Sequence, residues 1–211
     1  MNSIIGYLMK HITKNNIKKL LTLLVLLFSS SVISDDISDF QIEGISIGDN
    51  LLNFYNKSEI DSVPSYNYKN NEFKYYVFKL SDNSNYDYLQ ITVKTNNYLN
   101  NKYIIHSIAG VVVCRNDIEK CFIEQNKIRK DLDLFFNQNS IKTKGKHRQD
   151  KSNKSTWENF AYFLTDSKYS DIDITLYDNS YEFEKQGQWD NLQVIISSQE
   201  FSEFIDEEAW N

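Results

Sequence analysis

Hydrophobic and polar positions follow two different periods along the chain. Strict alternation over Tyr86–Thr95 places the aliphatic residues of this segment on one face, which is typical of a half-buried strand. The segment Tyr103–Val113 is apolar on both faces, and therefore indicates a central, covered strand. From Asp117 to Phe136 the apolar residues recur at helical spacing, which predicts a long amphipathic helix.

The same patterns predict the remaining elements. We expect further strands near Glu72–Leu80, Trp157–Leu164, Asp171–Asp178 and Leu192–Ile196, a short helix near Asp49–Asn56, a last helix near Ser198–Trp210, and a polar, basic loop from about Asn137 to Ser155. Consecutive strands with short links favour an antiparallel sheet. We therefore predict a single α+β domain over residues 35–211, mostly antiparallel, with helices packed on one face. The order of elements also fits two helix–three-strand units.

The first 34 residues differ from the rest. They hold four lysines and an apolar run over Leu20–Phe28, and no acidic residue precedes Asp35. This arrangement predicts a signal peptide cleaved after Ser34. The run is shorter than the about 20 apolar residues that a membrane helix needs, although an uncleaved anchor stays open as an alternative. We expect an exported protein, periplasmic or extracellular, that does not span the membrane after cleavage.

Removal of that segment would leave a strongly acidic chain. The 211 residues include 23 basic and 29 acidic side chains, so loss of four lysines leaves a formal charge of −10. Such a chain repels phosphates, which excludes nucleic acid as an expected partner. One local exception is a basic stretch that could contact anions or form a solvated loop: Lys142, Lys144, Lys146 and Arg148.

Residues 44–48, Gly-Ile-Ser-Ile-Gly, match the G-x-S-x-G nucleophile elbow of serine hydrolases. An elbow follows a buried strand and needs a later histidine, and the only later candidates are His106 and His147. A capping box at the start of a helix explains this motif better, because Ser46 precedes Asp49 by three residues. The same spacing recurs at two later predicted helix starts: Asn116 with Glu119, and Ser197 with Glu200. We therefore predict helix caps at these positions and no catalytic residue.

The remaining candidate sites are few. Cys114 and Cys121 could form a disulfide or remain two buried thiols. Zinc is not expected, because neither later histidine has ligand-like spacing to them, and no other metal or cofactor is predicted. His106 fits a satisfied sheet histidine. Asp171 and Asp173 share the outer face of a predicted strand, where a solvated surface is the default expectation and a bound cation or basic partner the alternative.

Two segments carry resemblances to known proteins. IEGISIGDNLLNFY, residues 42–55, resembles the opening of the outer-membrane assembly lipoproteins and the β-lactamase inhibitor proteins, which share a helix-then-meander plan. With the closing segment DNLQVIISSQEF, residues 190–201, the chain is also similar to exported bacterial proteins of unknown function with an IxGxSxGDSLL opening. The first resemblance implies binding rather than catalysis, and the second implies no known activity. No cysteine lies near the predicted cleavage site for lipid attachment.

Together these observations predict an exported, non-catalytic domain that binds a protein or an envelope component. The alternative is an exported serine hydrolase that uses Ser46.

Overall fold

The computed structural model describes residue 37 and residues 40–68, 71–95, 103–115, 117–164 and 168–207. All of these belong to one compact unit, Asp35–Asn211. The predicted signal peptide lies outside the described residues. Within the described part of the chain, no helix is both long and apolar enough to cross a membrane.

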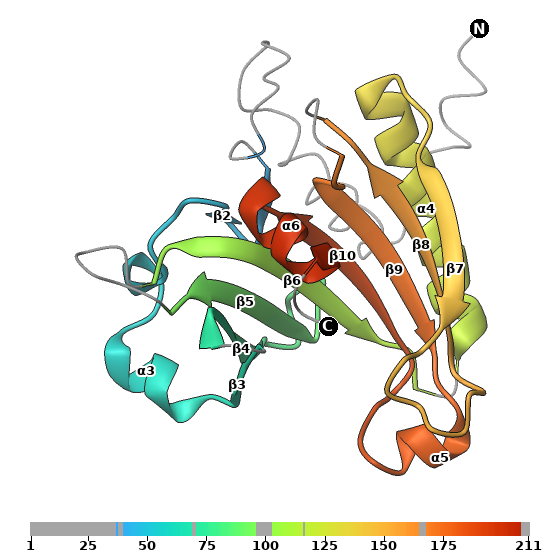
Figure 1. Ribbon diagram of the computed structural model, residues 1–211, viewed down its shortest axis with the longest axis horizontal. Helices are drawn as coiled ribbons and strands as arrows, with labels where there is room; N and C mark the ends of the chain where they lie inside the picture. Colours follow the sequence, from blue (N-terminus) through green and yellow to red (C-terminus); the bar gives the residue numbers. More distant parts are fainter. Residues whose placement is uncertain are drawn as a thin grey trace, which may run out of the picture. The chain divides into compact units, whose positions relative to one another are not determined.

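The described residues form an eight-stranded antiparallel sheet with the strand order β3-β4-β5-β6-β10-β9-β8-β7 (Figure 1). Its strands are β3 (Ser65–Asn67), β4 (Phe73–Lys79), β5 (Tyr88–Lys94), β6 (Ile105–Val113), β7 (Ile141–Lys146), β8 (Thr156–Tyr162), β9 (Ile172–Asp178) and β10 (Asn191–Ser197). A small separate hairpin consists of β1 (Gln41–Ile42) and β2 (Ile45–Ser46). The predicted α+β class and antiparallel sheet are confirmed.

The sheet has two halves that meet where β6 pairs with β10. This pairing runs over seven residues, from Asn191 opposite Val113 to Ser197 opposite Ser107. Each half has four strands, because β3 and β7 add one strand to each predicted group of three. The strand β7 lies inside the segment that we expected to be a loop, since its sequence, IKTKGK, is too polar to show a hydrophobic face.

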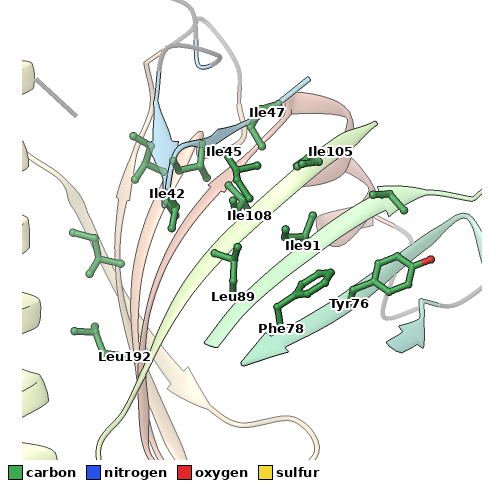
Figure 2. Close-up of a cluster of buried hydrophobic side chains, with 14 of the residues drawn as sticks. Ile42, Ile45, Ile47, Tyr76, Phe78, Leu89, Ile91, Ile105, Ile108 and Leu192 are labelled. Carbon is green, nitrogen blue, oxygen red and sulfur yellow. The ribbon is translucent and has the colours of Figure 1, made fainter. Parts of the chain in front are cut away.

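One face of the sheet carries the main hydrophobic core, and we name it the core face. Leu89, Ile91 and Ile108 are fully buried there, and Ile42 and Ile45 of the β1–β2 hairpin pack onto them (Figure 2). Complete burial of each such side chain stabilises the fold by about 1.5–3 kcal/mol. The alternation of apolar and polar residues in each strand therefore decides which face is covered.

The helix α4 (Ile118–Phe136) follows β6 in the chain and packs on the core face, against β9 and β10. Its fully buried Gln125 donates from Nε2 to the backbone carbonyls of Glu158 and Ile174, each at 3.0 Å. The hydroxyl of Tyr162 in turn donates to the backbone carbonyl of Arg129, at 2.8 Å. Because these bonds join particular residues, they fix the position of α4 along the strands in addition to holding the helix on the sheet.

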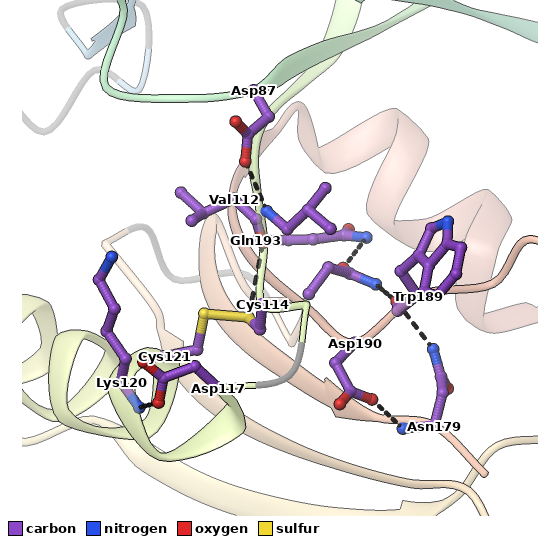
Figure 3. The surroundings of a disulfide bond; sticks show 12 residues. Asp87, Val112, Cys114, Asp117, Lys120, Cys121, Asn179, Trp189, Asp190 and Gln193 are labelled. Atoms are coloured by element: carbon purple, nitrogen blue, oxygen red, sulfur yellow. Dashed lines mark hydrogen bonds between the residues drawn. A yellow bond between two sulfur atoms is a disulfide. The ribbon is translucent and has the colours of Figure 1, made fainter. Parts of the chain in front are cut away.

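A disulfide ties the start of α4 to the end of β6 (Figure 3). Cys114 and Cys121 are bridged, with 6.0 Å between their Cα atoms. Between them the carboxylate of Asp117 accepts a hydrogen bond from the Lys120 amide and caps the helix. The amide of Cys114 also donates to the Asp190 carbonyl at 2.8 Å, so the junction is held on the sheet side as well.

The last helix, α6 (Gln199–Glu207), packs against the opposite face of the sheet (Figure 1). Phe201 and Phe204 contact Phe73 of β4 and Tyr68 in a second apolar cluster. The one-face arrangement that we expected therefore describes α4 and not α6, because the aromatic partners of α6 point away from the core face. Three shorter elements complete the described fold: the 3-10 turn η2 (Leu51–Asn53), α3 (Lys57–Ser62) and α5 (Tyr181–Glu184).

Removing the disulfide should lower the free energy of unfolding by about 2–3 kcal/mol, because a bridge across a short loop removes roughly that much chain entropy from the unfolded state. The measurement is denaturant unfolding of the Cys114→Ala/Cys121→Ala double variant against the oxidised wild type. Reduction of the wild type should produce the same loss and leave the double variant unchanged. Equal stability of the double variant and the oxidised wild type would contradict this role.

Candidate ligand-binding groove

A groove of about 750 Å³ lies over the sheet face that also carries α6, and we name this the groove face. The strand register aligns Gln90, Ala109, Ile195, Asp173 and Ala161 in one row across its floor. Both alanines are buried. The two alanines occupy the second and the last position of the row, and their small side chains leave more space above the floor than larger side chains would.

A hydrogen-bonded network fixes the polar groups at the floor. Asp173 accepts from Asn159 Nδ2 at 2.6 Å and from Ser170 Oγ at 2.7 Å. Thr175 Oγ1 donates to the side-chain oxygen Oδ1 of Asn159 at 3.1 Å. Burial raises the pKa of Asp173, while its two hydrogen bonds lower the pKa and nearby Asp171 raises it further. The floor therefore has a defined donor and acceptor pattern before any ligand arrives.

Tyrosines stand at one end of the groove. The rings of Tyr66 and Tyr75 are stacked, with 5.1 Å between their centroids, and Tyr68 packs against Tyr75 at 5.5 Å. Tyr66 is 54% exposed, so its ring is available for contact. This end combines flat apolar surfaces with phenol hydroxyls.

A second aromatic group lies at the other end, in the region of the β7–β8 connection. The His147 ring packs on Tyr177 and Phe183, at centroid distances of 5.7 and 4.8 Å. Burial lowers the pKa of His147, which favours the neutral ring. Asp150 holds this connection by accepting hydrogen bonds from the Ser155 and Ser180 hydroxyls, and the Ser155 hydroxyl in particular holds the pKa of Asp150 well below its usual range.

The wall formed by α6 is attached by a cluster of ionisable side chains. Lys94 forms ion pairs with Glu200 and with Glu72. His106 Nδ1 lies 3.3 Å from a Glu200 carboxylate oxygen and 3.2 Å from Ser198 Oγ. Burial lowers the pKa of His106 despite the nearby carboxylate. His106 occupies the extra position of an irregularity in the β5–β6 pairing, which directs it toward α6.

Ser46 does not begin a helix, contrary to our prediction. It lies in β2, opposite Gln41, and is 6% exposed. Asp49 Oδ2 accepts from the Ser46 amide at 2.8 Å, so the carboxylate reaches back three residues, but it closes a turn. Gly44 and Gly48 have φ values of +78° and +87°, which only glycine adopts readily, and this turn geometry accounts for both glycines of the motif.

Other residues cap the helices that the structure describes. Asn56 and Glu59 form a capping box at the start of α3. Ser198, rather than Ser197, accepts from the Phe201 amide at 3.3 Å and caps α6, because β10 continues through Ser197. Glu200 therefore binds Lys94 and His106 instead of a helix end. Asn116 lies outside the described residues, and Glu119 lies in the first turn of α4, which Asp117 caps.

The other predicted residues divide between the two faces. Asp171 is buried, with its carboxylate accepting from the Leu164 amide, so it is not part of a solvated surface. Lys142, Lys144 and Lys146 occupy alternate positions of β7 and therefore share one face, the one opposite the groove. Lys142 is paired with Glu158 at 2.8 Å. Arg148 follows in the β7–β8 connection, and the anion-contact role of these residues stays a prediction.

Sequence reasoning missed most of the groove. Gln90, Gln193 and Asn159 occupy polar positions of alternating strands and line the groove, but the sequence analysis predicts no site at any of them. The available signal was their type, since they are amides rather than the lysines and glutamates common on exposed strands. Among the described residues, no three histidine, cysteine or acidic side chains are grouped to hold a metal ion.

No family model matches the chain, and neither a curated protein nor a solved structure matches it. The resemblances of the opening and closing segments therefore stay predictions.

The capping assignment can be tested with one pair of substitutions. Asn56→Ala should lower the free energy of unfolding by about 0.5–2 kcal/mol, because it removes the side-chain oxygen that accepts from the Glu59 amide. Ser46→Ala should cost less, because the Ser46 hydroxyl accepts no helical amide among the described residues. Chemical denaturation of both variants measures this, and the reverse order would restore Ser46 as the cap.

The raised pKa of Asp173 predicts a pH dependence of stability. A carboxyl whose folded pKa is raised contributes most below its unfolded pKa, and this contribution is lost as pH rises through the folded value. The free energy of unfolding of the wild type minus that of Asp173→Asn should therefore fall as the pH rises above the ordinary aspartate pKa of about 3.9. Asp178→Asn, an exposed aspartate at the end of the same strand, is the control. A difference that stays constant or grows with pH would contradict the assignment.

Proposed function

We propose that this protein is an exported, non-catalytic domain that binds a protein or an envelope component through the groove face. The single observation that carries the proposal is the groove itself, whose floor holds Asp173, Asn159 and Ser170 in a fixed network. Polar groups held in place before binding lose little freedom when a ligand arrives. The network is therefore suited to recognition.

Two features support export. The Cys114–Cys121 bridge is a kind of bond that persists in oxidising compartments and is rare in the cytosol. The lysine-rich, apolar N-terminal segment has the composition of a signal peptide. Because these features come from different parts of the chain, each supports export independently.

The arrangement around Ser46 favours binding over hydrolysis. A nucleophilic serine needs a base within hydrogen-bond reach. Of the two described histidines, His106 contacts Ser198 and Glu200, and His147 Nδ1 accepts from the Gln149 amide. Ser46 itself is buried on the hairpin that covers the core face, and is not among the residues that line the groove.

The test compares how much of an envelope component the protein captures when its groove is open and when a substitution fills the groove. Gln90→Trp places a large ring on the floor, whereas Gln186→Trp places the same ring on an exposed position of the α5 region outside the groove. We expect wild type and Gln186→Trp to retain the same component from a detergent-solubilised envelope fraction, and Gln90→Trp to retain at least about tenfold less. Quantitative mass spectrometry and sugar analysis of the eluates measure this.

Equal retention by both tryptophan variants, with both folded by circular dichroism, would show that the groove is not the binding site. The hydrolase alternative has its own outcome. A fluorophosphonate probe should not label the protein, and labelling that disappears in Ser46→Ala would replace the binding proposal with catalysis.

A further inference from the structure

We propose that the ligand of the groove is a neutral oligosaccharide, an inference that rests on the proposed binding function and specifies its ligand class. The hydrogen-bonding groups, the charges, the backbone and the aromatic rings of the groove each favour such a ligand.

The groove offers many neutral hydrogen-bonding side chains. Among its described lining residues are eight amide side chains and six serine or threonine hydroxyls. Gln193 Nε2 donates to Asn191 Oδ1 at 2.9 Å, which fixes the orientation of that amide. The Gln90 side chain makes no hydrogen bond to another described residue, so both ends of its amide are available. Amides can donate and accept at once, as each sugar hydroxyl also does.

Formal charge is scarce in the groove although the chain is rich in it. Only three of its 29 described lining residues carry formally charged side chains: Lys168, Asp173 and Asp206. In the whole sequence, charged residues make up 25%. Lys168 is already paired with Glu207 at 2.7 Å. A phosphate or carboxylate ligand would find no arginine among these lining residues to bind it in the usual bidentate way. The charge pattern therefore favours an uncharged ligand.

The floor also disfavours a peptide and an apolar ligand. Backbone groups of β5, β6, β10, β9 and β8 are used in the sheet ladder, so a peptide cannot add as a strand there and only side chains can read the ligand. An apolar ligand would cover Gln90 and Asn159 without replacing their contacts with water, and this loss is costly. A ligand with many hydroxyls avoids both problems.

The aromatic residues complete the match. Tyr66, whose exposed ring is stacked on Tyr75, lies at one end, and Tyr177 lies at the other. A sugar ring has apolar C–H faces and polar edges, so it can lie on a tyrosine ring while its hydroxyls reach neighbouring amides. The groove volume of about 750 Å³ falls within the range of sites for small ligands. An oligosaccharide that runs across the strands would contact both aromatic ends.

The experiment starts with the purified protein on an array of neutral and anionic bacterial surface glycans, followed by calorimetric titration of the neutral oligosaccharide that binds best. We expect neutral glycans to be retained and anionic ones not. Tyr66→Ala and Gln193→Ala should each weaken binding by about tenfold or more. The matched controls Tyr181→Ala and Gln186→Ala remove exposed side chains of the same types outside the groove, and should leave the affinity unchanged.

Three results would overturn this inference: no neutral glycan retained, anionic glycans bound as tightly as neutral ones, or equal loss of affinity in the groove variants and their controls. The result also separates the two proposals. If Gln90→Trp abolishes envelope capture but no neutral glycan binds, the ligand class is wrong and the groove function stands. If Gln90→Trp has no effect on capture, the proposed function fails as well.

Discussion

The pairing of β6 with β10 is the constraint on which the other features depend. These strands are adjacent in the sheet but separated in sequence by two helices, α4 and α5, and three strands, and seven residue pairs align them. That register sets Ala109 beside Ile195 and Ser107 beside Ser197 on the groove face, and Ile108 beside Ile196 on the core face. A shift by one residue would exchange these two sets of side chains. The core and the groove are therefore consequences of one pairing.

The two helices on opposite faces have different attachments. The disulfide at Cys114 and the hydrogen bonds of Gln125 join α4 to the sheet through covalent and backbone contacts. The ion pairs of Glu200 and an aromatic cluster around Phe73 join α6 through side chains. Exposed ion pairs contribute little and weaken with salt, so aromatic packing supplies most of the attachment of α6. Of the two helices, α6, which forms the wall of the groove, is therefore the less firmly attached.

The sequence predicted the fold where the evidence is local and failed where it depends on distant partners. Alternation in β5 and β9 and helical spacing in α4 identified these elements, because each pattern matches one buried face. Ser46 was misassigned because a carboxylate three residues ahead can close a turn as well as a helix. The groove could not be predicted, since its floor combines residues from Gln90 to Gln193 whose alignment depends on the register between strands. Asp173 was noticed as an outward-facing carboxylate, yet its partners Asn159 and Ser170 come from other positions in the fold.

The division of each strand between two faces also bears on how such a protein can diverge. Substitutions at Gln90, Asn159 or Gln193 change the groove surface, where we propose that a ligand binds, and leave Leu89, Phe160 and Leu192 in the core untouched. Insertions or deletions of one residue in these strands, in contrast, would reverse the faces and disrupt both. Under the proposed binding function, selection varies recognition by point substitution at fixed strand lengths, so homologues with different ligands should preserve the spacing of the chain more closely than its outward-facing residues.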